Sequence, residues 1–299
     1  MRASFAAALV TVLVTGCGSL GGGSKRSAPK PRTLDLVWRQ AGPAVALVLG
    51  TSDYAPGTIR ISFLVVDPRG RVVDRPRARF WIARARDGAP FAETTARRER
   101  IGVGSPGEDA DAKSVYVAHL RVARPGRYWA VARPVGGRRI GGIREIDVKR
   151  RSATPPIGVH AFRSRTPTLA TAAAARLTTR RPPDRQLLRY SIASSLAAHK
   201  PFVVVFATPR FCESRMCGPA VDVVDAARRR FARRGIRFIH VEIYRDNNPA
   251  NGENRWVEQW HLPTEPWTFL VGADGRIKAK FEGSVSLGEL VEAIRRHLL

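Results

Sequence analysis

Apolar and polar residues alternate with a period of two along residues 34–149. Six runs show this alternation, separated by turn-forming Gly, Pro and Asp residues, and they cover residues 44–50, 58–67, 77–86, 114–122, 126–135 and 141–150. Short alternating runs at regular spacing are typical of antiparallel strands that bury one face. We therefore predict an all-β, immunoglobulin-like sandwich over residues 34–149, with Tyr128 or Trp129 in its core and a docking or spacer role.

The pattern changes at residue 185. Helical spacing over residues 184–200 is followed by an apolar strand at 201–208, an amphipathic helix at 218–235 and a second strand at 236–244. A polar loop, a short helix at 255–262, a hairpin at 266–283 and a closing helix then complete the chain, with Ser286 as N-cap and Glu289 three residues on. Strands that alternate with helices predict an α/β sheet with helices on both faces, over residues 185–299. Residues 150–184, rich in Pro, Thr, Ala and Arg, read as a linker.

The first residues read as an export signal. Arg2 precedes a short apolar stretch that is too short to span a membrane, and the sequence Val-Thr-Gly-Cys ends at Cys17. This ending resembles the lipobox of bacterial lipoproteins. The resemblance implies a signal peptide over residues 1–16, lipidation of Cys17 and a flexible tether over residues 17–33. A plain secretory signal with a chance cysteine is the alternative. We expect a lipid-anchored protein on the extracytoplasmic side of the cell membrane.

Composition and charge narrow the choice of partners. Hydrophobic residues make up 44% of the chain, enough for a core, and the formal net charge is +26. The electrostatic field of so positive a chain favours binding to anionic surfaces such as phospholipid headgroups. No nucleic-acid-binding motif accompanies it, so we predict no nucleic-acid partner.

Two cysteines remain for chemistry once Cys17 is assigned to lipid. Cys212 and Cys217 lie between an apolar strand and a helix, with four residues between them. An isolated close pair in an exported protein tends to form a disulfide. The pair can be a working dithiol, a structural disulfide or part of a metal site.

The surroundings of this pair carry a second resemblance. Residues 203–208 (VVVFAT) lead into the cysteines, and residues 266–277 (PWTFLVGADGRI) join a proline, an apolar strand and an Asp-Gly turn. With the order of elements, these features make residues 185–299 resemble a thioredoxin-like domain of the exported, membrane-anchored kind. The resemblance implies thiol-disulfide exchange without a cofactor, with protein thiols or disulfides of the cell envelope as partners. It places Pro266 at the family's cis-proline position, facing the cysteines.

The cysteine motif departs from the family's Cys-Gly-Pro-Cys. If Cys217-Gly218-Pro219 corresponds to its first three residues, then Cys217 is the nucleophile, Ala220 replaces the second cysteine and Cys212 resolves. If Cys212 is instead the first cysteine, the loop contains an insertion. We prefer the first alignment because Pro219 then lies in the first turn of the helix.

Several further residues belong to the predicted site. A helix N-terminus, with the positive charges of Arg210 and Arg215, is expected to lower the pKa of the attacking thiol, and Glu213 opposes this to a smaller extent. The Glu265 backbone and the residues Gly218, Pro219 and Trp267 are expected to contact the partner. A buried acid beneath the cysteines is not evident, with Glu242 a weak candidate.

Two other functions remain open. In one, the domain is a binding scaffold with an inert disulfide. In the other, it resembles copper-binding proteins of the Sco type, which add a histidine to a cysteine pair, with His240 and His261 as candidates. Packed histidines are the more common case, and we predict no metal.

Overall fold

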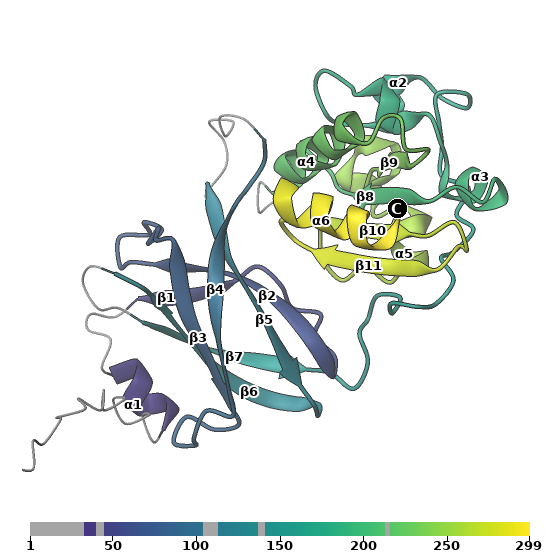
Figure 1. Cartoon of the computed structure of the whole chain (residues 1–299). Coiled ribbons are helices and arrows are strands. Elements are labelled where there is room, and N and C mark those ends of the chain that lie inside the picture. Colours follow the sequence, from purple (N-terminus) through teal and green to yellow (C-terminus); the bar gives the residue numbers. More distant parts are fainter. Residues whose placement is uncertain (1–32, 40–44, 104–112, 137–140, 213–215) are drawn as a thin grey trace, which may run out of the picture. The chain divides into compact units, whose positions relative to one another are not determined.

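The computed structural model describes residues 33–39, 45–103, 113–136, 141–212 and 216–299 (Figure 1). The predicted signal peptide, Cys17 and nearly all of the tether therefore lie outside the described residues. Within the described ranges, no helix is both long and apolar enough to cross a bilayer.

The first part of the described chain is a seven-stranded antiparallel sheet. Each of the six alternating runs forms a strand, because alternation leaves one face of each run apolar. The strands are β1 (Ala46–Leu49), β2 (Gly57–Val66), β3 (Arg77–Ala83), β4 (Ala92–Arg100), β5 (Ser114–Val122), β6 (Gly126–Pro134) and β7 (Gly142–Val148). β4 was not predicted: its sequence is mostly polar and charged, and Ala96 is its one buried residue.

The strands run in the order β1-β2-β5-β4-β3-β6-β7, in one continuous sheet. The predicted division into two separate sheets is not confirmed, because β3 pairs with both β4 and β6 and so links the two halves. The two end strands also approach each other at Gly142, where an added Cβ would lie 2.8 Å from the backbone nitrogen and Cβ of Leu47. The sheet is therefore nearly closed, and a side chain at position 142 would separate its ends.

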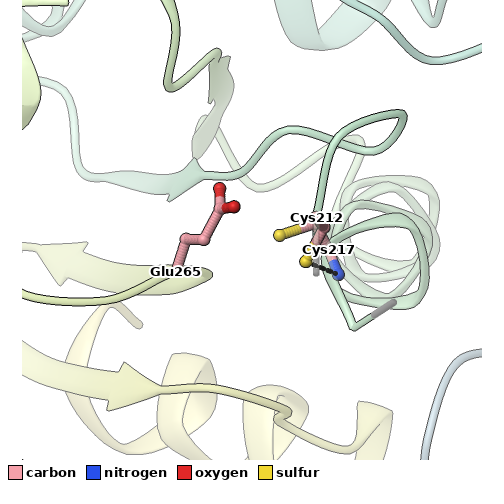
Figure 2. A group of neighbouring side chains, drawn as sticks. All are labelled: Cys212, Cys217 and Glu265. Carbon is pink, nitrogen blue, oxygen red and sulfur yellow. Dashed lines mark hydrogen bonds between the residues drawn. The ribbon is translucent and has the colours of Figure 1, made fainter. Parts of the chain in front are cut away.

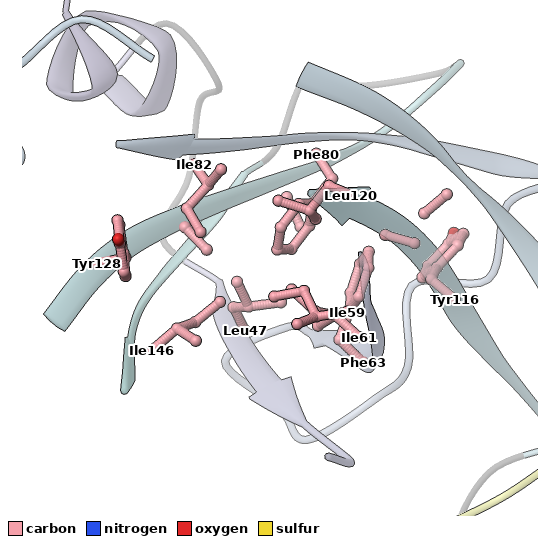
Figure 3. Close-up of a cluster of buried hydrophobic side chains, with 14 of the residues drawn as sticks. Leu47, Ile59, Ile61, Phe63, Phe80, Ile82, Tyr116, Leu120, Tyr128 and Ile146 are labelled. Atoms are coloured by element: carbon pink, nitrogen blue, oxygen red, sulfur yellow. The ribbon is translucent and has the colours of Figure 1, made fainter. Parts of the chain in front are cut away.

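The core of this sheet lies on its inner face (Figure 3). Every second residue of β2 faces inward: Ile59, Ile61, Phe63 and Val65 are at most 5% exposed. The ring centroids of Phe63 and Phe80 are 5.1 Å apart. Tyr128 is buried in the same cluster, as predicted, and its hydroxyl donates to the carbonyl of Arg124 at 2.6 Å.

A short helix, α1 (Leu34–Arg39), precedes the sheet and was not predicted. Leu34 and Val37 are fully buried, and they pack with Trp81, Ala83 and Val131 on the other face of β3 and β6. This helix explains why β3 carries apolar residues on both faces, a pattern that the period-two reading does not account for.

The second part of the described chain has the predicted alternation of helices and strands. Its elements are η1 (Arg185–Leu188), α3 (Ile192–Ala197), β8 (Phe202–Phe206), α4 (Cys217–Arg230), β9 (Arg237–Val241), η2 (Arg245–Asn247), η3 (Pro249–Asn251), α5 (Arg255–Gln259), β10 (Trp267–Val271), β11 (Ile277–Glu282) and α6 (Leu287–His297). The sheet order is β11-β10-β8-β9. β8 and β9 are parallel, with α4 between them in the chain, and β10 and β11 form the predicted hairpin.

Helices cover both faces of this sheet, as the sequence predicts. Val203 and Val205 of β8 pack in a cluster with residues of α4 and α6, whereas Phe202, Val204 and Phe206 pack in a second cluster with residues of α3 and α5. The buried strand is thus apolar on both sides, as its unbroken apolar run requires. Ser286 caps α6 through a capping box with Glu289, as predicted.

The predicted linker packs against the second sheet for part of its length. The backbone N–H of Gly158 donates to the carbonyl of Ile277 at 2.8 Å, and Ile277 N–H donates to Val159 at 2.9 Å. A short helix, α2 (Ala174–Leu177), lies farther along the same segment. Much of the linker is therefore ordered by the domain that follows it.

Candidate active site

The two cysteines lie in the connection from β8 to α4 and in the first turn of α4. β8 ends at Phe206, and α4 begins at Cys217, with Pro219 in its first turn as predicted. Met216 is the N-cap residue of α4, and its side chain makes no capping hydrogen bond. The backbone N–H of Cys217 instead donates to Sγ of Cys212 at 3.3 Å. The sulfur of Cys212 therefore supplies an acceptor that an uncapped helix terminus lacks.

Both cysteines are buried, and their sulfurs are not joined to each other by a disulfide. Figure 2 shows both side chains beside Glu265. Cys217 is 0% exposed, whereas Cys212 retains 8% exposure. The two sulfurs and the carboxylate of Glu265 all lie within 4.8 Å of one another. The predicted proximity is present, and of the two residues only Cys212 retains any exposure to solvent.

The electrostatics of the two thiols also differ. Burial, together with its hydrogen bond to Cys212, raises the pKa of the Cys217 thiol. The predicted lowering of this pKa by the helix N-terminus is wrong for Cys217. The free N–H group points to the neighbouring sulfur, so the helix terminus favours negative charge on Cys212 instead.

Glu265 completes the group from the opposite side. It immediately precedes Pro266, and the Glu265–Pro266 peptide bond is cis, as the resemblance implied. The Glu265 side chain points toward the two cysteines in Figure 2, and its carboxyl group interacts with the Cys217 thiol. Burial, and next the negative charge of Cys212, raises the pKa of this carboxyl to about 8.

From the sequence, only the backbone of Glu265 is expected to belong to the site, as a contact for the partner. The position of its carboxyl group beside the two sulfurs is not predicted. For a buried acid, the sequence pattern offers only Glu242 as a weak candidate. Glu242 is buried, but its Oε1 accepts hydrogen bonds from the backbone and hydroxyl of Thr179. A carboxylate directly before the predicted cis-proline was the available signal.

The other residues predicted to contact a partner differ in their exposure to solvent. Trp267 is 2% exposed and stacks on Phe269 within the core, with its indole N–H donating to the Thr264 hydroxyl at 3.1 Å. The ring of Trp267 therefore packs in the core of the second sheet and does not form an exposed surface for a partner. Gly218 and Pro219 are partly exposed, and a Cβ added at Gly218 would meet nothing within 4 Å.

The predicted charges around the thiols are only partly described. Arg210 is exposed, and its guanidinium lies over the ring of Phe211, with 5.3 Å to the ring centroid. Glu213 and Arg215 lie outside the described residues. The contrast between the two thiols therefore rests on burial and on the helix terminus.

Neither candidate histidine joins the cysteines. The ring Nε2 of His240 hydrogen-bonds to the carbonyl of Ala207 at 2.9 Å, and His240 is buried. His261 is exposed and packs edge-on against Phe162, with ring centroids 6.4 Å apart. Within the described part of the chain, the group formed by the two thiols and Glu265 contains no imidazole.

Comparison with known proteins adds little to this geometry. The chain matches no known protein-family model and no curated protein. Among solved structures, it is similar to a thiol:disulfide interchange protein of the thioredoxin family from Chlorobium tepidum TLS, at 15% identity and a TM-score of 0.26. That similarity covers 36% of this chain and 86% of the other. A TM-score this low carries no argument about the function of this chain.

Proposed function

We propose that this protein exchanges thiols and disulfides with other proteins through Cys212 and Cys217. The observation that carries the proposal is the placement of two sulfurs within 4.8 Å at the N-terminus of α4. The β8-α4-β9-α5-β10-β11-α6 order, with Pro266 cis beside the pair, supports it because the thioredoxin resemblance implies the same arrangement.

The assignment of roles favours Cys212 as the nucleophile, the reverse of the preferred sequence alignment. Cys212 has the exposed fraction and accepts the N–H of Cys217, which stabilises a thiolate. Cys217 is fully buried, so it serves as the resolving thiol that attacks Cys212 in the mixed disulfide. Because one thiol is reactive and the other is buried, the order of steps is fixed: Cys212 attacks the partner first, and Cys217 resolves the mixed disulfide afterwards.

A trapping experiment tests these roles. Cys217→Ser removes the resolving thiol, so mixed disulfides between Cys212 and partner proteins should accumulate and be visible on non-reducing gels. Cys212→Ser should accumulate none. Adducts that form with Cys212→Ser and not with Cys217→Ser would reverse the assignment, and their absence from both variants would remove the proposed exchange.

A second candidate is a binding scaffold with a structural disulfide. The burial of both cysteines favours it, since a reactive thiol needs access. A disulfide that resists reduction well below about −300 mV would mark a structural bond. For the copper-binding alternative, the two thiols and Glu265 lie at metal-ligand distances from one another, but neither His240 nor His261 joins them in the described part of the chain. A reduced protein that takes up no Cu(I) would exclude it.

We also infer an immunoglobulin-like character for residues 34–149. Taken as strands A to G, the order is A-B-E-D joined to C-F-G, the two strand sets of immunoglobulin domains. The hydrogen bond from the Tyr128 hydroxyl to the Arg124 carbonyl, near the start of the sixth strand, resembles the tyrosine corner of such domains. An experimental structure with Tyr128 in solvent would contradict this inference.

The location of the protein remains a proposal drawn from residues 1–33. We propose that Cys17 carries lipid and holds the protein on the extracytoplasmic side of the cell membrane, where envelope proteins would be its partners. Mass spectrometry of the N-terminal peptide tests this. An unmodified Cys17 in the mature protein would contradict the lipid anchor.

A further inference from the structure

Exchange at this site requires proton transfer from a thiol that holds its proton tightly. In the proposed roles, Cys217 attacks the mixed disulfide at Cys212, and only its thiolate is a competent nucleophile. Cys217 is 0% exposed, so bulk water has little access to its proton. A base inside the site is therefore needed, and the roles given to the two cysteines do not supply one.

The Glu265 carboxyl group has the position that such a base requires. It belongs to the same group of three side chains as the two sulfurs, with donor atoms within 4.8 Å of one another (Figure 2). It interacts directly with the Cys217 thiol. The residue reaches the site from the start of β10, whereas both cysteines come from the β8–α4 connection and α4.

The same carboxyl group has no evident structural task. Its Oε2 atom is buried and has no hydrogen-bond partner among the described residues. None of the ion pairs within the described ranges includes Glu265. A buried carboxylate oxygen without a partner costs folding free energy, and such groups are found where chemistry requires them.

We propose that Glu265 is the acid–base residue of the cysteine pair. This inference rests on the proposed exchange function and adds to it the route of the proton. The Glu265 carboxylate accepts the proton of the Cys217 thiol as Cys217 attacks, and the protonated carboxyl returns a proton to Cys217 when the reaction runs backward.

The Cys212 thiolate attacks a disulfide of the partner protein, so a Cys212–partner bond forms and one partner sulfur leaves as a thiolate. Glu265 then takes the Cys217 proton, Cys217 bonds to Cys212, and the second partner sulfur leaves as a thiolate. The protein dithiol loses two electrons and two protons, and the partner disulfide gains them as two thiols, the protons passing through Glu265 and solvent.

The charges that face Glu265 support this role. Burial raises its pKa most, and the negative charges of Cys212, Glu242 and Glu253 raise it further, to about 8. The hydrogen bond with Cys217 acts in the opposite direction. A pKa near the working pH suits a group that must both accept and release a proton in each cycle.

The test follows the two halves of one turnover separately. Reduced protein is mixed with dithiobis(nitrobenzoate), an aromatic disulfide whose released thiolate absorbs visible light. The first release reports attack by Cys212, and the second reports attack by Cys217. The aromatic thiolate that is released needs no proton. The rate of the second release therefore depends on the loss of the Cys217 proton and not on protonation of the leaving group.

Glu265→Gln keeps the size of the side chain and removes the base. We expect the second release to slow by about 100-fold near neutral pH, because acid–base groups typically contribute that much or more. The first release should change little. In the wild type the second phase should rise with pH as Glu265 loses its proton, at a pH no higher than about 8 because Cys212 carries no charge in the mixed disulfide. In Glu265→Gln that rise should disappear and the rate should increase only at higher pH. Glu265→Asp should keep the rise at a lower rate.

Glu258→Gln is the matched control, since Glu258 is an exposed glutamate of α5. A second phase that is unchanged in Glu265→Gln, or a first phase that slows equally, would overturn the role of Glu265 and leave the exchange function in place. Absence of any release by the wild type would instead remove the exchange function on which it rests.

Discussion

At the scale of single residues, the site is defined by three side chains with unlike surroundings. Cys212 accepts a backbone N–H and keeps some exposure, Cys217 is fully buried, and Glu265 presents a carboxyl group to it. Two chemically identical thiols thus differ in access and in the stability of their charged forms. The proposed roles of the cysteines rest on this difference, which depends on neighbouring residues outside the cysteine motif.

The raised pKa of Glu265 predicts a pH dependence of stability in the reduced protein. The folded-state pKa of about 8 lies above the ordinary glutamate value of 4.5, so the stability contributed by the neutral form of Glu265 is present below about pH 4.5 and is lost as the pH rises through about 8. Glu265→Gln stays neutral at every pH. Its unfolding free energy should therefore exceed that of the wild type progressively between these pH values, by the order of 2 kcal/mol since the side chain is only partly buried.

Chemical denaturation at about pH 5 and about pH 9 measures this difference. Glu258→Gln, on the exposed face of α5, should show no such change between the two pH values. A Glu265→Gln variant whose advantage is the same at both would show that the carboxyl is already ionised in the folded protein at low pH, in conflict with its raised pKa.

At the scale of elements, helix α4 depends on Cys212. The N-cap side chain makes no hydrogen bond, and the Cys212 sulfur accepts the N–H of Cys217. Cys212→Ala removes this acceptor and should lower the unfolding free energy of the reduced protein by about 1 kcal/mol, as loss of a cap typically does. Cys212→Ser retains an acceptor and should lose less. Equal stability of the two variants in denaturant unfolding would show that the sulfur does not cap the helix.

Most elements are predictable from the sequence because burial follows periodicity. The six alternating runs, the apolar strand β8 and the capped helix α6 all form where the pattern predicts them. The pattern fails for β4, whose side chains are mostly exposed and so lack an apolar face, and for α1, which is too short for a helical period.

The site was predictable only in part, for a related reason. Sequence reasoning found the cysteine pair and the cis Pro266, because both stand in local motifs. The roles of the cysteines, the burial of Trp267 and the carboxyl of Glu265 depend on contacts between distant segments. A sequence pattern describes neighbours along the chain and leaves these contacts open.

At the scale of the whole molecule, the proposed chemistry lies within residues 185–299, and the preceding sheet contributes no described cysteine or histidine to the group of two thiols and Glu265. We take residues 34–149 as a spacer or docking domain and residues 1–33 as the proposed anchor. In this arrangement the exchange domain would act on envelope proteins near the membrane, and the net charge of +26 on the whole chain would favour the anionic surface there.

The central claim is that the two cysteines interconvert between dithiol and disulfide under envelope conditions. The most direct measurement is the reduction potential of the pair, obtained by equilibrating the purified protein in thiol–disulfide buffers and quantifying free thiols. We predict one two-electron transition, at a potential above about −300 mV, that is absent from Cys212→Ser and Cys217→Ser. A disulfide that forms and stays oxidised well below about −300 mV, or a pair that forms no disulfide at any potential, would contradict it.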